Sequence, residues 1–415
     1  MSDDRTFKAS LLGEVADHPR YKNDFPETTM HATSPRPFAL LFARLLGVAA
    51  LLGAFASAQE VLGPDERELV ARMLRRGEVS EALTTLDEVL DELPEDRASR
   101  ALRGRARYLT GDYEGAVADV DAALAEGGAL APAEAADAAR IRLELATELG
   151  RTAELGGSLP ALRARLDPAG DPRDAWTLAR FELEAGRRKE ALALFQQGSD
   201  SLLREGWEVL LARARCQRAL GFLERSAETV VAADKLARDG DGSEPEILVE
   251  LGELYFEVYG ETDSPVSRAH SPGLLAREAL RIDHEHEGAR LLLFQLSRWN
   301  WTRTQDSPEE LLEAVFTARP ASLAGLLART SAALDDGDLP TARTALARLL
   351  ELAPLRRAVR AEQAALAWIE HRRDEARALL AQLAEEDAAE HASDGGELTR
   401  AAGRAEPLEG RDVTG

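Results

Sequence analysis

The chain has few cysteines, few aromatic residues and no excess of positive charge, and each of these scarcities argues against a class of protein. Its 415 residues include one cysteine, Cys216, so no disulfide can form within the chain. Aromatic residues make up only 5% of the sequence, while alanine, leucine, arginine and glutamate are abundant, which favours helices packed through small residues over β-sheet. The net charge of -23 leaves no excess of cations for phosphate contacts, which argues against nonspecific binding to nucleic acid.

The short motifs of common enzymes are missing as well. The sequence contains no H-E-x-x-H, no phosphate-binding G-x-x-x-x-G-K-[ST] and no G-x-S-x-G. Asp283-His284-Glu285-His286 gathers possible zinc ligands, but it falls in a predicted turn between helices. Cys216 lies among apolar residues, so we expect a buried small residue there and not a reactive thiol. We therefore expect no catalytic residues, no metal and no cofactor.

The two ends of the chain differ from its middle. Residues 1–29 are a polar leader, which is not translated if Met30 is the true start, and residues 30–58 are typical of a secretory signal peptide. An apolar run at residues 45–56 follows Arg44, and Ala56-Ser57-Ala58 is a cleavage pattern. That run is shorter than the ~20 residues of a spanning helix, so a cleaved signal is favoured and a retained membrane anchor is the alternative. Residues 391–415 are glycine-rich and charged, which predicts a disordered tail.

One stretch predicts the architecture of the middle. Residues 108–124, YLTGDYEGAVADVDAAL, read as a helical hairpin in which Gly111 ends one helix and Asp112 starts the next. Gly77 and Ala82 lie 34 residues before Gly111 and Ala116, and equivalent glycines follow at Gly150, Gly186, Gly221 and Gly337. This period indicates a stack of about nine hairpins over residues 59–390, because a single hairpin cannot bury its apolar face.

On these residues the chain resembles tetratricopeptide repeat proteins, and among them exported bacterial ones. The family's glycines match Gly104 and Gly111, and its closing proline matches Pro94, Pro168, Pro320 and Pro354. Its small residues in the second helix match Ala82, Ala116, Ala123, Ala191, Ala342 and Ala376. Departures are Gly128 and His284, where proline is usual, and Leu155, where a small residue is usual. The resemblance implies an all-α, right-handed α-α superhelix whose concave groove is lined by the first helix of each hairpin.

The register of that family also predicts which side chains line the groove. It places Arg105, Arg180 and Arg215 at one equivalent position, and Tyr108, Arg140, Trp176 and Arg218 at other groove positions. Guanidinium groups form bidentate hydrogen bonds with carboxylates, so such a set suits an acidic peptide. Because 47 of the 51 basic residues are arginine, the alternative is that these side chains pair with neighbouring Glu and Asp on a solvated face.

The sixth and seventh hairpins are irregular. Gly252 and Ala279 are 27 residues apart where the family register gives 19, and the extra residues fall within residues 259–273. Trp299 and Trp301 follow the next helix, and we expect them to cover a junction between hairpins. Ser307 and Glu310 form a capping-box pattern that predicts the start of a helix.

These features predict a non-enzymatic interaction scaffold. We expect it to hold a partner protein or peptide in its concave groove within the bacterial cell envelope, and an acidic partner if the groove arginines are available to bind it. Contact with a membrane follows only if the signal segment is not cleaved. The alternative is the N-terminal repeat region of a larger envelope zinc metallopeptidase, since the chain resembles envelope proteins in which such repeats precede that enzyme domain.

Overall fold

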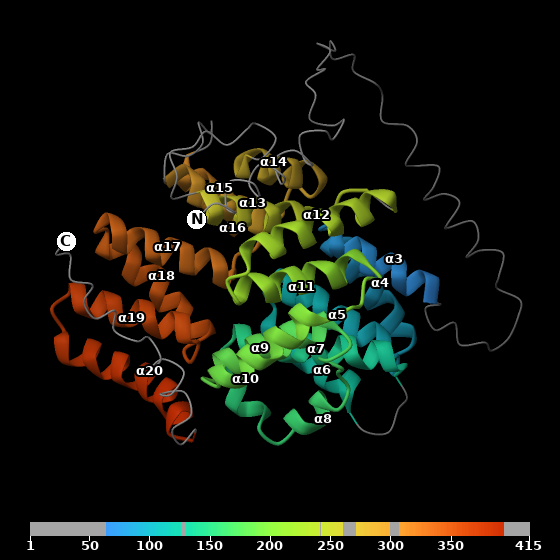
Figure 1. Ribbon diagram of the computed structural model, residues 1–415, viewed down its shortest axis with the longest axis horizontal. Coiled ribbons are helices and arrows are strands. Elements are labelled where there is room, and N and C mark those ends of the chain that lie inside the picture. The colour runs from blue at the N-terminus through green and yellow to red at the C-terminus, as the bar shows by residue number, and fades with distance from the viewer. Residues whose placement is uncertain (1–63, 126–129, 241, 260–270, 299–306, 394–415) are drawn as a thin grey trace, which may run out of the picture.

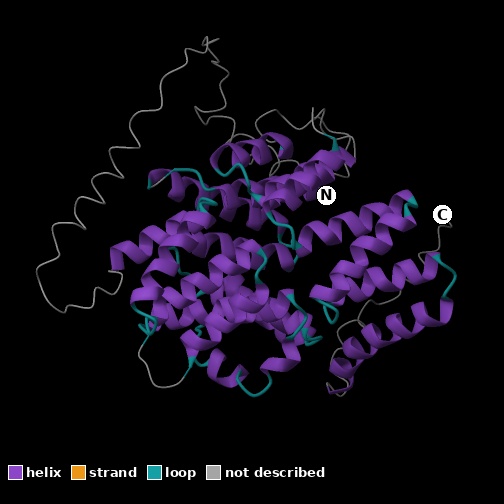
Figure 2. Cartoon of the chain, turned by 180° about the vertical axis from the view of Figure 1, so that it is seen from behind, coloured by secondary structure: helices purple, strands orange, loops and turns teal. Residues whose placement is uncertain are grey.

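The computed structural model describes residues 64–125, 130–240, 242–259, 271–298 and 307–393. In these ranges the chain is helical, with no β-strand (Figure 2). None of the described helices is long and apolar enough to cross a membrane. The leader, the signal segment, most of the insertion, Trp299, Trp301 and the tail beyond residue 393 lie outside the described residues.

The described helices form nine successive hairpins. They are α3 (Pro64–Arg75) with α4 (Val79–Glu92), α5 (Arg97–Thr110) with α6 (Tyr113–Leu124), α7 (Pro132–Glu148) with η2 (Thr152–Leu155) and α8 (Leu159–Arg163), α9 (Pro172–Glu184) with α10 (Arg188–Asp200), α11 (Trp207–Ala219) with α12 (Leu223–Asp239), α13 (Pro245–Tyr259) with α14 (Pro272–Ile282), α15 (Glu287–Arg298) with α16 (Pro308–Ala318), α17 (Leu323–Asp336) with α18 (Leu339–Leu352), and α19 (Arg357–Ile369) with α20 (Arg373–Ser393). This arrangement confirms the predicted all-α solenoid.

The repeated small residues have the structural roles that the pattern predicts. The glycines between paired helices all have positive φ angles, from 68° at Gly150 to 84° at Gly111, a conformation that disfavours other residues. The alanines that match the family pattern in the second helices are all fully buried, so neighbouring backbones can approach closely. They are Ala82, Ala116, Ala123, Ala191, Ala342 and Ala376. Ser307 accepts a hydrogen bond from the Glu310 amide at 3.2 Å, which confirms the capping box.

Two hairpins depart from the regular form. In the third, a 3-10 turn and the five-residue α8 replace the second helix, because Gly156 and Gly157 interrupt it. Leu155 is 2% exposed there and fills the space where the other hairpins place alanine. In the ninth, His371 takes the place of the inter-helix glycine and has a φ of 63°. Among the described non-glycine residues, His371 is the one with a positive φ, a conformation that strains its backbone.

The solenoid closes on itself, so that its later hairpins touch its earlier ones (Figure 1). The Tyr113 hydroxyl donates to the carbonyl oxygen of Ala321 at 2.9 Å. Glu148 pairs with Arg356 at 2.8 Å, and Glu184 accepts a hydrogen bond from the Arg357 amide at 2.7 Å. We call this line of contacts between hairpins 2–4 and 8–9 the seam. The seam brings together residues that are more than 170 positions apart in the sequence.

Candidate functional site

The clearest candidate site is a cavity of about 900 Å³ on the inner wall of the solenoid. First helices of four successive hairpins supply most of its lining: α9, α11, α13 and α15. Four of the residues predicted from the groove register meet here, namely Trp176, Arg180, Arg215 and Arg218. The opposite wall is acidic and comes mainly from α13, which contributes Glu250, Glu253, Phe256 and Glu257, with Gln295 from α15.

The arginines of this cavity are already paired with carboxylates. Arg215 Nε lies 2.8 Å from Glu250, and Arg218 contacts Glu250, Glu253 and Glu257 at 2.7 to 2.9 Å. Burial would raise the pKa of Glu250, but the charges of Arg215 and Arg218 outweigh it and hold that pKa below its ordinary value. The cavity is therefore lined by ion pairs, and its guanidinium groups are not vacant.

A second ion-pair cluster connects the cavity to the seam. Glu148 pairs with Arg180, which lines the cavity, and with Arg356 of the seam. Arg180 also lies over the ring of Trp176, with 5.8 Å between the guanidinium carbon and the ring centroid. Burial and the charges of Glu148 and Glu144 raise the pKa of the nearby Tyr108 well above its ordinary value, so its hydroxyl stays protonated.

The remaining predicted site residues lie apart from this cavity. Tyr108 packs against Tyr113, with 6.0 Å between the ring centroids. Arg140 pairs with Asp137 and Asp174 and is almost buried. Arg105 is exposed, and no ion pair joins it to any part of the chain that the structure describes. Pairing within the chain thus accounts for Arg140, Arg180, Arg215 and Arg218, and binding of an acidic peptide by this set stays a prediction.

Sequence reasoning missed the acidic wall of the cavity. Glu250, Glu253 and Glu257 follow one another at intervals of three and four residues, which places them on one face of a helix. That spacing was visible in the sequence. What it did not reveal is that this face of α13 lies opposite Arg215 and Arg218 of α11, because the partner helix depends on how the hairpins stack.

The possible metal ligands in the turn before α15 have structural roles. His286 Nδ1 accepts a hydrogen bond from the Ala289 amide, and Asp283 accepts one from the Glu285 amide, so both shape the helix start. Within the described ranges, no three His, Cys, Asp or Glu side chains are grouped closely enough to hold a metal. Cys216 is fully buried as predicted, and burial raises the pKa of its thiol to about 12.

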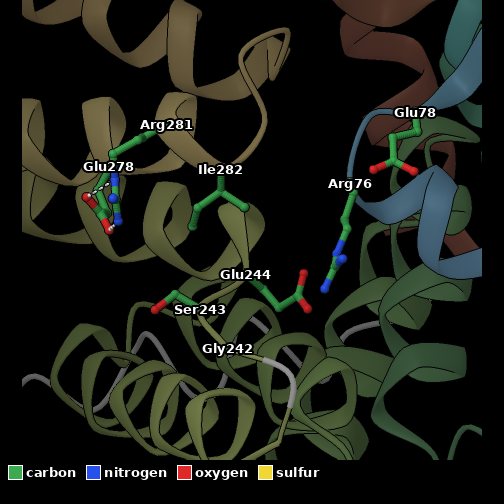
Figure 3. Close-up of a pocket in the computed structure, with 8 residues that line it drawn as sticks. All are labelled: Arg76, Glu78, Gly242, Ser243, Glu244, Glu278, Arg281 and Ile282. Carbon is green, nitrogen blue, oxygen red and sulfur yellow. Dashed lines mark hydrogen bonds and ion pairs between the residues drawn. The ribbon is translucent and has the colours of Figure 1, made fainter. Parts of the chain in front are cut away.

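A smaller cavity of about 330 Å³ lies where the first hairpin meets the sixth (Figure 3). Arg76 and Glu244 point toward one another across it, while Glu278 and Arg281 pair with each other on α14. Burial raises the pKa of Glu244, and the charges of Arg75 and Arg76 oppose that shift. Glu278 and Arg281 satisfy each other, and Arg76 and Glu244 carry opposite charges on facing sides of the cavity.

The period of 34 residues, the left-handed glycines and the buried alanines together define the repeat. The hairpins thus keep the glycine and alanine pattern by which the chain resembles tetratricopeptide repeats. No protein-family model matches the chain, and no curated protein matches it.

Several solved structures are similar to this chain at low identity. A human IFIT1 dimer with PPP-AAAA is 13% identical over 79% of this chain and 77% of that one, with a TM-score of 0.42. Yeast Tom70 is 13% identical over 98% of each chain, with a TM-score of 0.35. A fragment of a TPR repeat-containing protein from Cytophaga hutchinsonii is 10% identical over 71% and 97%, with a TM-score of 0.26. At these scores, nothing about the binding or activity of those proteins transfers to this one.

Proposed function

We propose that this chain is a non-enzymatic scaffold that binds a segment of a partner protein in the cavity between α9 and α15. The observation that supports the proposal is the cavity itself. It is large enough for one or two side chains, and it combines the aromatic rings of Trp176 and Phe256 with several charged groups. Rigid first helices, stacked through buried alanines, hold these side chains in place.

Site-specific photo-crosslinking tests this proposal. A photoreactive residue at Gln295, which lines the cavity and is exposed, should form a discrete adduct with a partner in an extract of the native organism. The matched control is the same residue at Glu351, which is exposed on the second helix α18. The purified partner is then titrated against Trp176→Ala, which should lower its affinity at least about tenfold. An adduct equally strong from both positions, or unchanged affinity, would contradict a groove site.

We also propose that the chain is exported to the cell envelope. The support comes from the sequence, in which an apolar run and an Ala56-Ser57-Ala58 cleavage pattern precede the solenoid. Mass spectrometry of the protein isolated from its native cell should find a mature N-terminus at Gln59. A peptide that spans Ala58 and Gln59 would instead show that the segment is retained.

A further inference from the structure

The acidic wall of the cavity carries more negative charge than its arginines neutralise. In the described part of the chain, the ion pairs of Glu250, Glu253 and Glu257 on α13 are with Arg215 and Arg218 on α11. Three carboxylates therefore share two guanidinium groups. Arg180 does not correct the difference, because its own partner is Glu148, which it shares with Arg356, and Glu144 adds a further negative charge beside it.

The surplus charge is on the side chains that remain open to the cavity. The Glu250 side chain is 6% exposed and is covered by its two arginines, whereas Glu253 is 38% exposed and Glu257 is 45% exposed. Each of these two shares Arg218 with the other carboxylates and keeps oxygen lone pairs free for further donors. The rings of Trp176 and Phe256 line the same cavity. Carboxylates beside aromatic rings are the environment that a guanidinium or ammonium group prefers.

We infer that the partner inserts a cationic side chain, arginine in preference to lysine, between these aromatic rings and the carboxylates of Glu253 and Glu257. Arginine is preferred because its planar fork can reach two carboxylates while it stacks on a ring. This inference rests on the proposed function, since it names the chemistry of the segment that the cavity binds. The overall charge of -23 attracts such a segment from a distance, so its association slows as salt is added.

The test uses a random peptide library displayed on phage and the whole chain from Gln59 onward. Wild-type protein should enrich peptides that carry arginine, and an enriched peptide made synthetically should bind measurably. Glu253→Gln with Glu257→Gln should weaken that binding about tenfold or more. This variant keeps the pair of Arg218 with Glu250 at 2.9 Å, so we expect it to fold.

A matched control separates local recognition from general attraction. Glu313→Gln with Glu351→Gln also removes two negative charges, but it takes them from exposed ion pairs with Arg329 and Arg348 outside the cavity. This control has the same net charge as the cavity variant, yet its affinity for the arginine peptide should stay within about twofold of that of wild type. An equal loss in both variants would overturn the inference, because attraction would then depend on net charge alone.

A second variant tests the sign of the required charge. Arg218→Gln leaves Glu253 and Glu257 without their guanidinium partner while Glu250 keeps Arg215, so the variant should bind the arginine peptide at least as tightly as wild type. Loss of binding in this variant, or enrichment of acidic or uncharged peptides by wild type, would overturn the inference of a cationic anchor. Either result would still support the proposed function, because a peptide would bind in the groove. If no peptide is enriched above an unrelated control protein, the proposed function fails together with this inference.

Discussion

Two chemically identical substitutions should have unequal effects, because only one of the two sites lies under the seam. Gly150 and Gly221 occupy the same place between paired helices, with φ angles of 68° and 79°. A side chain in this conformation costs about 1–2 kcal/mol at either position. A β-carbon at Gly221 meets nothing within 4 Å, whereas one at Gly150 lies within 2.6 Å of backbone atoms of Leu355 and Arg356. Alanine at Gly150 must therefore push the opposing turn away.

The expected magnitude follows from the contacts that this movement breaks. Carbon atoms need about 3.5 Å of separation, so the turn must retreat by about 1 Å. The pair of Glu148 with Arg356, now at 2.8 Å, then loses its direct contact, as does the 2.7 Å hydrogen bond from the Arg357 amide to Glu184. Breaking a buried pair costs about 3–5 kcal/mol, and we take the lower end because Glu148 keeps Arg180. Gly150→Ala should therefore cost about 4–5 kcal/mol in total and Gly221→Ala only the conformational part of about 1–2 kcal/mol.

Urea unfolding followed by circular dichroism measures the loss for each variant. Hydrogen exchange at the Arg357 amide reports on the seam alone and should speed up only in Gly150→Ala. Small-angle scattering should show a larger radius of gyration for that variant, because its later hairpins are no longer held against the earlier ones. Equal destabilisation by the two substitutions, together with unchanged exchange at Arg357, would refute the closed seam.

Three further substitutions test other features. Glu148→Gln should cost about 2 kcal/mol at pH 7, while the exposed control Glu114→Gln costs little. Burial would raise the pKa of Glu148, but Arg356 and Arg180 outweigh it and hold the pKa below its ordinary value. The stability from this charge is thus present above the unfolded pKa of about 4.3 and is lost as pH falls through the folded pKa, so acid titration should close the gap between variant and wild type. His371→Gly should raise the free energy of unfolding by about 1 kcal/mol by relieving a φ of 63°, seen as a higher urea midpoint. Arg105→Glu should leave stability within about 0.5 kcal/mol, and calorimetric titration with the cross-linked partner would then show lost affinity only if that partner binds through carboxylates.

The sequence alone was enough to predict the local structure of each hairpin. Glycines at a spacing of 34 mark the turns, because only glycine adopts positive φ without strain, and alanines mark the buried face, because close helix packing needs small side chains. Both patterns depend on contacts within one hairpin or between two neighbouring hairpins, so they can be recognised in the sequence without the whole structure. Leu155, in place of a small residue, marked a departure in the third hairpin, but the division of its second helix into a 3-10 turn and α8 was not predicted.

The partners of the charged side chains were decided only by the tertiary structure. Arg180 was predicted to face the groove, and it does line the cavity, but its carboxylate partner Glu148 is 32 residues away and also bonds Arg356 across the seam. Small rotations between successive hairpins accumulate along a solenoid, so whether its turns meet cannot be read from the repeat pattern. The sequence determined the hairpin and its repetition, while the stacking of neighbouring hairpins decided the ion pairs of the candidate site and the accumulated curvature decided the seam.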